Sequence, residues 1–169
     1  MALRREVLAA LPAMAFAGAT ARATPARDKA PCGARPGVSR SDFDQYVALY
    51  NAGDPGFTRF YADDVVMETV PPLTSAAAIG DFRRELSAYV VEHITVEYYV
   101  ADENGSAAQF LGEFRCVRDM PVTALSGLFG KGVKKGQVLR QRGIILYGVK
   151  NGKFTWIRAA PPFILQDWS

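Results

Sequence analysis

The apolar residues of this chain recur first with helical spacing and then with strand spacing. A helical face forms at i, i+3, i+4 and i+7 from Phe43, Tyr46, Val47 and Tyr50. Ser41, three residues before Asp44, is the predicted N-cap of this helix, and Gly53 is its predicted end. The pattern then predicts a short helix over residues 55–61, a strand over 64–69 and a third helix over 76–90. Three residues of the third helix are expected to point inward: Ile79, Phe82 and Leu86.

From residue 94 the apolar period changes to two. Strands are predicted over residues 94–101, 107–117, 138–149 and 153–160, with turn signals at Asn104-Gly105 and Asn151-Gly152. In the second of these strands the inward set is Ala108, Phe110, Gly112, Phe114 and Cys116. Helices followed by antiparallel strands predict an α+β domain, with three N-terminal helices packed over one face of a curved sheet.

The first 37 residues have a different character. Residues 1–23 combine a basic start, an apolar run and a small-x-small site at Ala21-Arg22-Ala23, which is typical of a signal peptide. Arg4-Arg5 also fits a twin-arginine signal, and the general export route stays open as the alternative. The run is too short for a stable membrane anchor. Residues 24–37 are predicted to be a flexible linker before a domain over 38–169, in the periplasm or outside the cell.

Charge gives no reason to expect a nucleic-acid partner. The formal net charge is +3, and removing residues 1–23 takes away three arginines and one glutamate, which leaves +1. A nearly neutral domain has no electrostatic footprint for nucleic acid or an anionic membrane. A single histidine, His93, and the absence of any CxxC spacing also give no support for a metal site or a cofactor. Cys32 and Cys116 either form a disulfide bond, or Cys116 is a small buried residue of its strand.

The segment from Phe43 to Glu68 resembles the start of the nuclear transport factor 2-like superfamily. The match is carried by Gln45-Tyr46-Val47-Ala48-Leu49, Ala52-Gly53-Asp54 and Tyr61-Ala62-Asp63-Asp64. That superfamily includes ketosteroid isomerases, limonene-epoxide hydrolases, scytalone dehydratases and SnoaL-type polyketide cyclases. The resemblance implies a cone-shaped, cystatin-like α+β roll around one pocket, and a homodimer formed through the outer face of the sheet.

Comparison with ketosteroid isomerases argues against that particular activity. Tyr46 falls on the tyrosine of the family's oxyanion hole. The family's base position falls on Thr69 and its second oxyanion acid falls on Ile144. Because threonine is too weak an acid to shuttle a proton, we do not expect ketosteroid isomerase activity.

Three residues remain candidates for catalysis, namely Tyr46, Glu68 and Arg142. Tyr46 either donates a hydrogen bond to a ligand carbonyl or is a core tyrosine. Glu68 is a general base if it is buried and a solvated strand residue if it is not. Arg142, placed inward with Arg140, either holds an acidic ligand or pairs with Glu113 or Asp119. The predicted ligand contacts are Phe43, Tyr50, Thr69, Phe110, Phe114, Ile144 and Leu146.

A long connection and an exposed apolar patch are also predicted. Residues 120–136 form a long glycine- and lysine-rich connection, which is either a lid over the pocket or a flexible loop. An exposed apolar patch is predicted on the outer sheet face from Ile145, Tyr147, Phe154 and Trp156. The sequence therefore favours an exported small-molecule protein of the SnoaL-like kind. It is either a cofactor-independent isomerase, cyclase, dehydratase or hydrolase, or a non-catalytic binding protein for a hydrophobic ligand, or a structural dimer module.

Overall fold

The computed structural model of the protein describes residues 38–169. The predicted signal peptide and linker, together with Cys32, lie outside the described residues. Over the described part, no helix is long and apolar enough to cross a membrane.

The first helix, α1 (Arg40–Ala52), begins one residue before the predicted cap. Ser39, and not Ser41, is the N-cap, because its side chain accepts from the backbone N–H of Asp42 and donates to the Asp42 carboxylate. Gly53 ends the helix with φ 68, a left-handed conformation that glycine adopts without steric cost. The predicted end of α1 is therefore confirmed, while its predicted cap is wrong.

Two shorter helical segments follow, each with a polar cap. The 3-10 helix η1 (Pro55–Phe60) begins at Asp54, whose carboxylate accepts from the N–H of Gly56. The helix α2 (Ala76–Ser87) begins at Ser75, which accepts from the N–H of Ala78. Three helical segments precede the long strands, as predicted.

Six strands form one mixed sheet with the order β1-β5-β4-β3-β2, and β6 pairs with β4. Their bounds are β1 (Tyr61–Met67), β2 (Val90–Ala101), β3 (Gly105–Cys116), β4 (Val138–Lys150), β5 (Lys153–Ala159) and β6 (Phe163–Gln166). The pairs β2–β3, β3–β4, β4–β5 and β4–β6 are antiparallel, whereas β1 lies parallel to β5. The predicted α+β class with a curved sheet is confirmed, with this one parallel pairing added.

Several boundaries differ from the prediction; for example, β1 covers Tyr61–Met67 and not residues 64–69. The third helix ends at Ser87, not at residue 90, and β2 begins at Val90, not at residue 94. The residues between them, Val91-Glu92-His93, are therefore strand residues with alternating faces. The strand β6 was not predicted; it runs along the first half of β4, where β5 is no longer paired.

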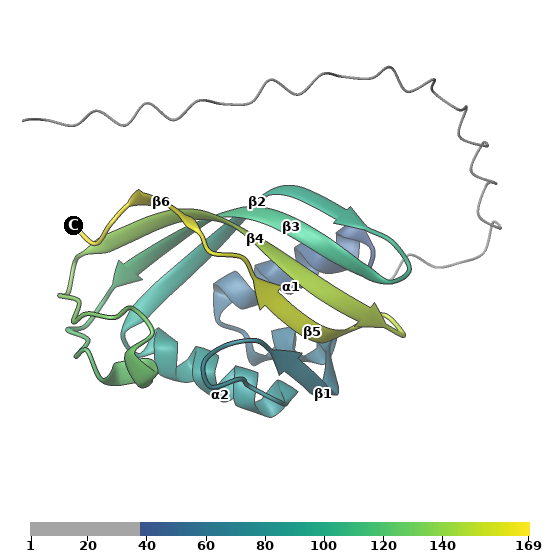
Figure 1. Cartoon of the computed structure of the whole chain (residues 1–169), viewed down its shortest axis with the longest axis horizontal. Coiled ribbons are helices and arrows are strands. Elements are labelled where there is room, and N and C mark those ends of the chain that lie inside the picture. Colours follow the sequence, from purple (N-terminus) through teal and green to yellow (C-terminus); the bar gives the residue numbers. More distant parts are fainter. Residues whose placement is uncertain (1–37) are drawn as a thin grey trace, which may run out of the picture. The chain divides into compact units, whose positions relative to one another are not determined.

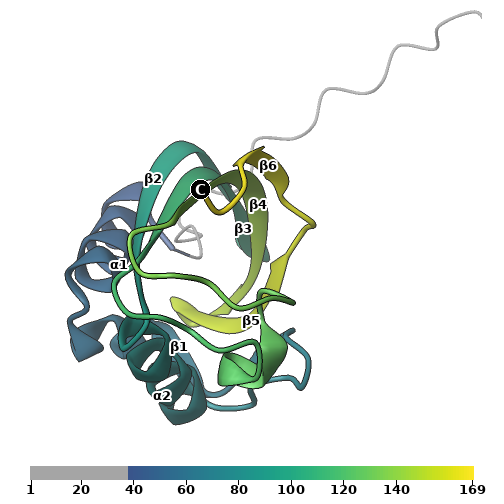
Figure 2. The ribbon, with the colours of Figure 1, turned by 90° about the vertical axis from the view of Figure 1, so that its left-hand side faces the viewer.

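The sheet curves around the helices, as Figures 1 and 2 show. Its pairing is interrupted between Val96 and Tyr98 on β2 and between Gly148 and Val149 on β4, irregularities that bend a sheet. The helices α1 and α2 cover its concave side.

The concave side holds two separate apolar clusters. The first cluster is built from α1, η1, β1 and β5 around Phe43, Tyr46, Phe57, Tyr61 and Phe154. The second fills the opposite end around Leu86, Phe114, Leu125, Leu139 and Trp168.

Candidate functional site

A layer with two charged side chains lies between the two apolar clusters. Along α2, Ile79 belongs to the first cluster and Leu86 to the second, and the buried Arg83 lies between them. Along β2, Ile94 packs on the first cluster and Val90 belongs to the second, with the buried Glu92 between them. Buried ionisable groups are rare unless they are paired or functional, so this layer is the candidate site.

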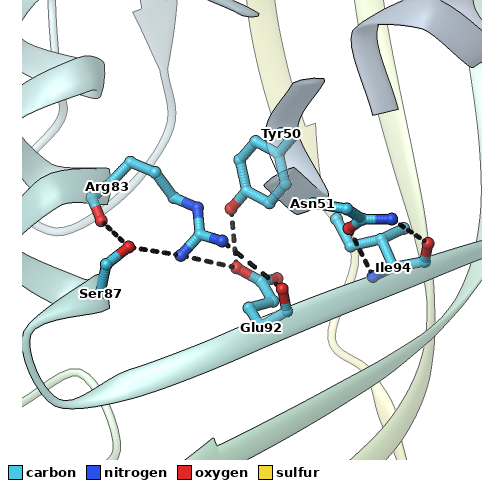
Figure 3. A network of polar contacts seen from close by, with 6 residues as sticks. All are labelled: Tyr50, Asn51, Arg83, Ser87, Glu92 and Ile94. Carbon is cyan, nitrogen blue, oxygen red and sulfur yellow. Dashed lines mark hydrogen bonds and ion pairs between the residues drawn. The ribbon is translucent and has the colours of Figure 1, made fainter. Parts of the chain in front are cut away.

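Tyr50, Arg83 and Glu92 form one network there, drawn in Figure 3. The Tyr50 hydroxyl donates to Glu92 Oε2 over 2.7 Å. Arg83 Nη1 lies 4.0 Å from the same oxygen, and Arg83 Nη2 donates to the Glu92 carbonyl over 3.5 Å. The guanidinium carbon also lies 4.4 Å from the centre of the Tyr50 ring, which is cation–π geometry. Three elements of the fold, α1, α2 and β2, thus each contribute one member.

The neighbouring contacts hold this network in place. The side chain of Asn51 pairs with the backbone of Ile94 through two hydrogen bonds of 2.8 Å, which fixes the end of α1 on β2 beside Glu92. Ser87 accepts from Arg83 Nη1 at 3.2 Å and donates to the Arg83 carbonyl at 2.8 Å. Tyr50 and Arg83 are therefore positioned by contacts outside the site itself.

Arg83 keeps one donor free. Its side chain is 7% exposed, and among residues 38–169 its Nε has no hydrogen-bond acceptor. A buried donor without an acceptor is costly in free energy, so such groups in folded proteins call for an explanation. An oxygen atom of a bound molecule would satisfy this N–H.

Burial sets the protonation chemistry of the layer. It raises the pKa of the Glu92 carboxyl above its ordinary value, against the opposing effects of the Tyr50 hydrogen bond and the Arg83 charge. Burial also raises the pKa of Tyr50 well above its ordinary value, so its hydroxyl stays a donor at neutral pH. A carboxyl group with a raised pKa is suited to accept and return a proton.

Tyr46, the first predicted catalytic residue, lies in the first apolar cluster. Its hydroxyl is 2.9 Å from the hydroxyl of Tyr61. The pKa of Tyr46 is raised to about 12, and the largest cause is burial of the phenol away from water. Phe43 lies beside it and stacks on Tyr99, with ring centres 4.2 Å apart. These contacts are those of a core tyrosine, the second of the two roles considered for Tyr46.

The other two predicted catalytic residues lie on the surface. Glu68 is exposed and forms a bidentate pair with Arg158, with distances of 2.6 and 2.7 Å. Arg142 is exposed and pairs in the same way with Glu97. Each pairing lowers the pKa of its carboxyl, which disfavours a role as a base. The inward orientation predicted for Arg142 is therefore wrong.

The same correction applies to the rest of β4. Ile144 and Leu146 were predicted to face the pocket, but both lie on the outer face, with 45% and 37% exposure. Tyr147 and Phe154, predicted to be outside, are buried in the first cluster. The reason is that residues 144–147 are all apolar, so a period of two has no polar position to fix the direction.

The remaining predicted ligand contacts lie in different parts of the protein. Phe110 and Phe114 face inward, as predicted, and their rings lie over Gly112, where an added Cβ would come within 3.1 Å of Phe114 and 3.6 Å of Phe110. Tyr50 is part of the network. Thr69 lies away from it, in a groove beside α2.

Two grooves flank α2. One, of about 560 Å³, is lined by mainly apolar residues of the β1–α2 connection, by both apolar and charged residues of α2, and by Leu125 and Leu128. The other, of about 710 Å³, lies between η1 and α2 and includes Arg83 and Ser87 in its wall. Both have the size of small-molecule sites.

Arg83 and Glu92 are not among the residues predicted from the sequence. The signal for Glu92 was its place in the alternation Val90, Glu92, Ile94, which was hidden because residues up to 90 were assigned to the helix. The signal for Arg83 was its spacing from Ile79 and Leu86 at i+4 and i−3. Within residues 38–169 no group of three His, Cys, Asp or Glu side chains is arranged to hold a metal ion.

Comparison with known proteins supports the fold. No protein-family model and no curated protein matches the chain. Among solved structures, a candidate polyketide cyclase from Xanthomonas campestris pv. campestris has a TM-score of 0.58 and 18% identity, with 69% of this chain and 84% of that chain covered. An LEH-like epoxide hydrolase from M. tuberculosis has a TM-score of 0.53 and 12% identity, with coverage of 72% and 78%. A computationally designed 17-OHP binder has a TM-score of 0.53 and 20% identity, with coverage of 70% and 88%. These similarities confirm the predicted nuclear transport factor 2-like fold.

Proposed function

We propose that this chain, which has the nuclear transport factor 2-like fold, is a small-molecule enzyme that uses Glu92 for acid–base chemistry. The observation that carries the proposal is the buried Tyr50–Arg83–Glu92 network, with its raised carboxyl pKa and its free Arg83 Nε. Solved structures of this fold include a candidate polyketide cyclase and an epoxide hydrolase, which fits small-molecule chemistry of this class.

The residues suit proton transfer beside a carbonyl group. The Glu92 carboxylate takes a proton from the carbon next to the carbonyl, and the electron pair of that C–H bond forms an enolate. The enolate oxygen accepts from Arg83 Nε, whose charge stabilises the negative charge that develops there. Glu92 then returns the proton to carbon, so the reaction needs no redox partner. The surrounding aromatic residues favour an apolar carbonyl- or hydroxyl-bearing ligand.

Exchange of carbon-bound hydrogen for deuterium tests this chemistry without knowledge of the natural substrate. Cyclohexanone and 1-tetralone are incubated with the protein in D₂O, and deuterium next to the carbonyl is followed by NMR. The wild type and Tyr46→Phe are expected to promote exchange, and Glu92→Gln is expected to lose it. Equal exchange by wild type and Glu92→Gln would refute the role of Glu92.

A binding protein without catalysis is the second candidate. It is favoured by the near-complete burial of Arg83 and Glu92, and by the similarity to a designed binder. The same experiment separates the two functions. A binding protein would hold the ketones, as seen by chemical-shift changes, but would not promote exchange.

We further propose a homodimer formed through the outer face of the sheet. Five apolar residues are exposed there, and these are Tyr98, Val100, Ile144, Leu146 and Trp156. The ion pairs Glu97–Arg142 and Glu68–Arg158 also lie at this face. An apolar centre with a charged rim is typical of a protein interface.

Export of the chain is part of the same proposal and rests on residues 1–23 alone. N-terminal sequencing of the protein recovered from the periplasm or the medium tests it. The expected mature chain begins at Thr24, after the Ala21-Arg22-Ala23 site. Recovery of the full-length chain from the cytoplasm alone would contradict it.

A further inference from the structure

The end of the cone that holds the second apolar cluster is closed by the β3–β4 connection, residues 117–137. Figure 2 looks onto this end and shows the connection crossing it beside the C-terminus. Met120, Leu125 and Val133 of the connection are buried against Phe114 and Leu139 of the sheet. Glu92 is the register partner of Phe114, so the connection covers the strand positions next to the proposed site.

The connection is fixed at its base. Met120 and Val133 exchange two backbone hydrogen bonds of 2.8 and 2.9 Å, and Cys116 is bonded in the same way to Gln137 and Gly136. Asp119 also accepts from Lys134 Nζ and from the backbone of Lys135. Between these points, the backbone hydrogen bonds described for residues 121–132 are local turns. The middle of the connection is therefore held to the protein by its side chains.

The last three residues of the chain hold that middle part. Trp168 is 9% exposed, and its ring meets the Phe129 ring edge-on, with centres 5.1 Å apart. Asp167 Oδ2 lies 2.7 Å from Lys131 Nζ. On the other side, Ser169 exchanges backbone hydrogen bonds of 3.0 and 3.3 Å with Val138 of β4. The segment thus joins the connection to the sheet.

We propose that Asp167-Trp168-Ser169 is a latch that keeps the β3–β4 connection closed over the interior of the cone. Its release lets the connection, including its Met120–Val133 pair, swing about its two ends at Cys116 and Gln137, and admits an apolar small molecule. This latch depends on the proposed function at one point only, namely that the site beneath the connection is the one that contains Glu92. Arg83 reaches the wall of the groove between η1 and α2, whereas the buried Glu92 lines neither groove, so a ligand reaches the Glu92 carboxylate only when a covering element moves away.

The thiol of Cys116 reports on this movement without any activity measurement. Cys116 is 1% exposed, and its Sγ lies 3.8 Å from the carbonyl oxygen of Val133 in the connection. In a Cys32→Ser background it is the remaining cysteine of the two in the chain. Its labelling by Ellman's reagent under native conditions then measures how often the connection opens.

Trp168→Ala is expected to speed Cys116 labelling by about 10-fold to 100-fold, since a buried aromatic contact that holds the connection is lost. Trp168→Phe is expected to give an intermediate rate. Trp156→Ala, which changes the tryptophan on the outer sheet face, is the matched control and should leave the rate unchanged. Hydrogen exchange should rise within residues 117–137 and not in β1 or α1. If Trp168→Ala does not fold, Trp168→Phe with Asp167→Asn replaces it.

Two results would overturn the latch. One is an unchanged labelling rate in the Trp168 variants. The other is a rate that rises only as far as global unfolding does, with hydrogen exchange raised throughout the domain. Glu92→Gln is expected to label at the wild-type rate, so the latch can stand or fall separately from the proposed chemistry.

Discussion

The Tyr50 hydroxyl on α1 donates to the Glu92 carboxylate on β2 over 2.7 Å, which joins residues 42 positions apart in the chain. This contact fixes the orientation of the one buried acidic side chain found among the described residues. It also separates the roles of two tyrosines on the same helical face. The Tyr50 hydroxyl bonds to an ionisable carboxyl group, whereas the Tyr46 hydroxyl bonds to the hydroxyl of another tyrosine.

Tyr50→Phe and Tyr46→Phe form a matched pair. Tyr50→Phe removes the hydrogen bond that lowers the pKa of Glu92, so that pKa should rise and turnover or ligand affinity should fall by about 10-fold or more. Tyr46→Phe leaves the Tyr61 hydroxyl without its partner and should cost about 1 kcal/mol of stability with little change in activity. Ligand titration and urea unfolding of both variants check this. An activity loss in Tyr46→Phe that exceeds that in Tyr50→Phe would return Tyr46 to the site.

The stability of the protein should depend on pH through Glu92. Because folding raises the pKa of Glu92, this residue adds stability below the ordinary glutamate pKa of about 4.3, and that contribution is lost as pH rises through the folded value. Glu92→Gln does not titrate. The wild type should therefore lose stability relative to Glu92→Gln as pH rises from 4 to 8.

Urea unfolding of the two proteins across that pH range measures the difference. Glu68 and Glu97, whose pKa values are lowered by arginine partners, are present in both proteins, and their opposite pH dependence cancels. A difference that is constant with pH, or that changes in favour of the wild type as pH rises, would contradict the burial of an ionisable Glu92.

Arg83→Met should be strongly destabilising. It removes the buried cation beside Glu92 and should cost about 3 kcal/mol, because the carboxyl is left without its charge partner. Adding Glu92→Gln should recover part of that loss, since the unpaired acid is also removed. Arg84→Met, on the next residue of α2, is the control; its pair with Asp81 is exposed and should contribute less than about 1 kcal/mol. Additive losses in the double variant would show that Arg83 and Glu92 do not interact.

The outer face of the sheet can be tested separately. Leu146→Glu places a charge in the centre of the exposed apolar patch and should convert the proposed dimer to a monomer in sedimentation velocity experiments. Val70→Glu, at a 95% exposed position on the β1–α2 connection, should leave the dimer intact. A wild-type protein that sediments as a monomer at all concentrations would refute this interface.

The sequence predicts the fold well where its pattern of apolar and polar residues is compatible with only one orientation of a helix or strand. The strand β3 alternates between apolar and polar residues, so the directions of Phe110 and Phe114 are predicted correctly. Gly53 and the aromatic face of α1 similarly fix the end and the buried side of the first helix. In β4, four successive residues are apolar, so the sequence pattern does not show which of their side chains face the core. The register with β3 decides which of them are buried.

The candidate site is less predictable because its members come from three elements. Glu92 and Arg83 each look like a surface residue when read alone, and only the closing of β2 against α2 makes them partners. Conversely, Glu68 is a candidate base when its strand is read alone, but Arg158 on the adjacent β5 pairs with it. These cross-strand and helix–sheet contacts depend on tertiary packing, which a period of two or of 3.6 does not specify.

In the proposed function, Glu92 is a buried proton acceptor that a bound ligand contacts. The most direct measurement is a ¹³C NMR titration of the Glu92 side-chain carboxyl, assigned by comparison with Glu92→Gln, with and without bound 1-tetralone. We expect a pKa above the ordinary glutamate value in the free protein and a change in that pKa when the ketone binds. An ordinary pKa that the bound ketone does not alter would contradict the account.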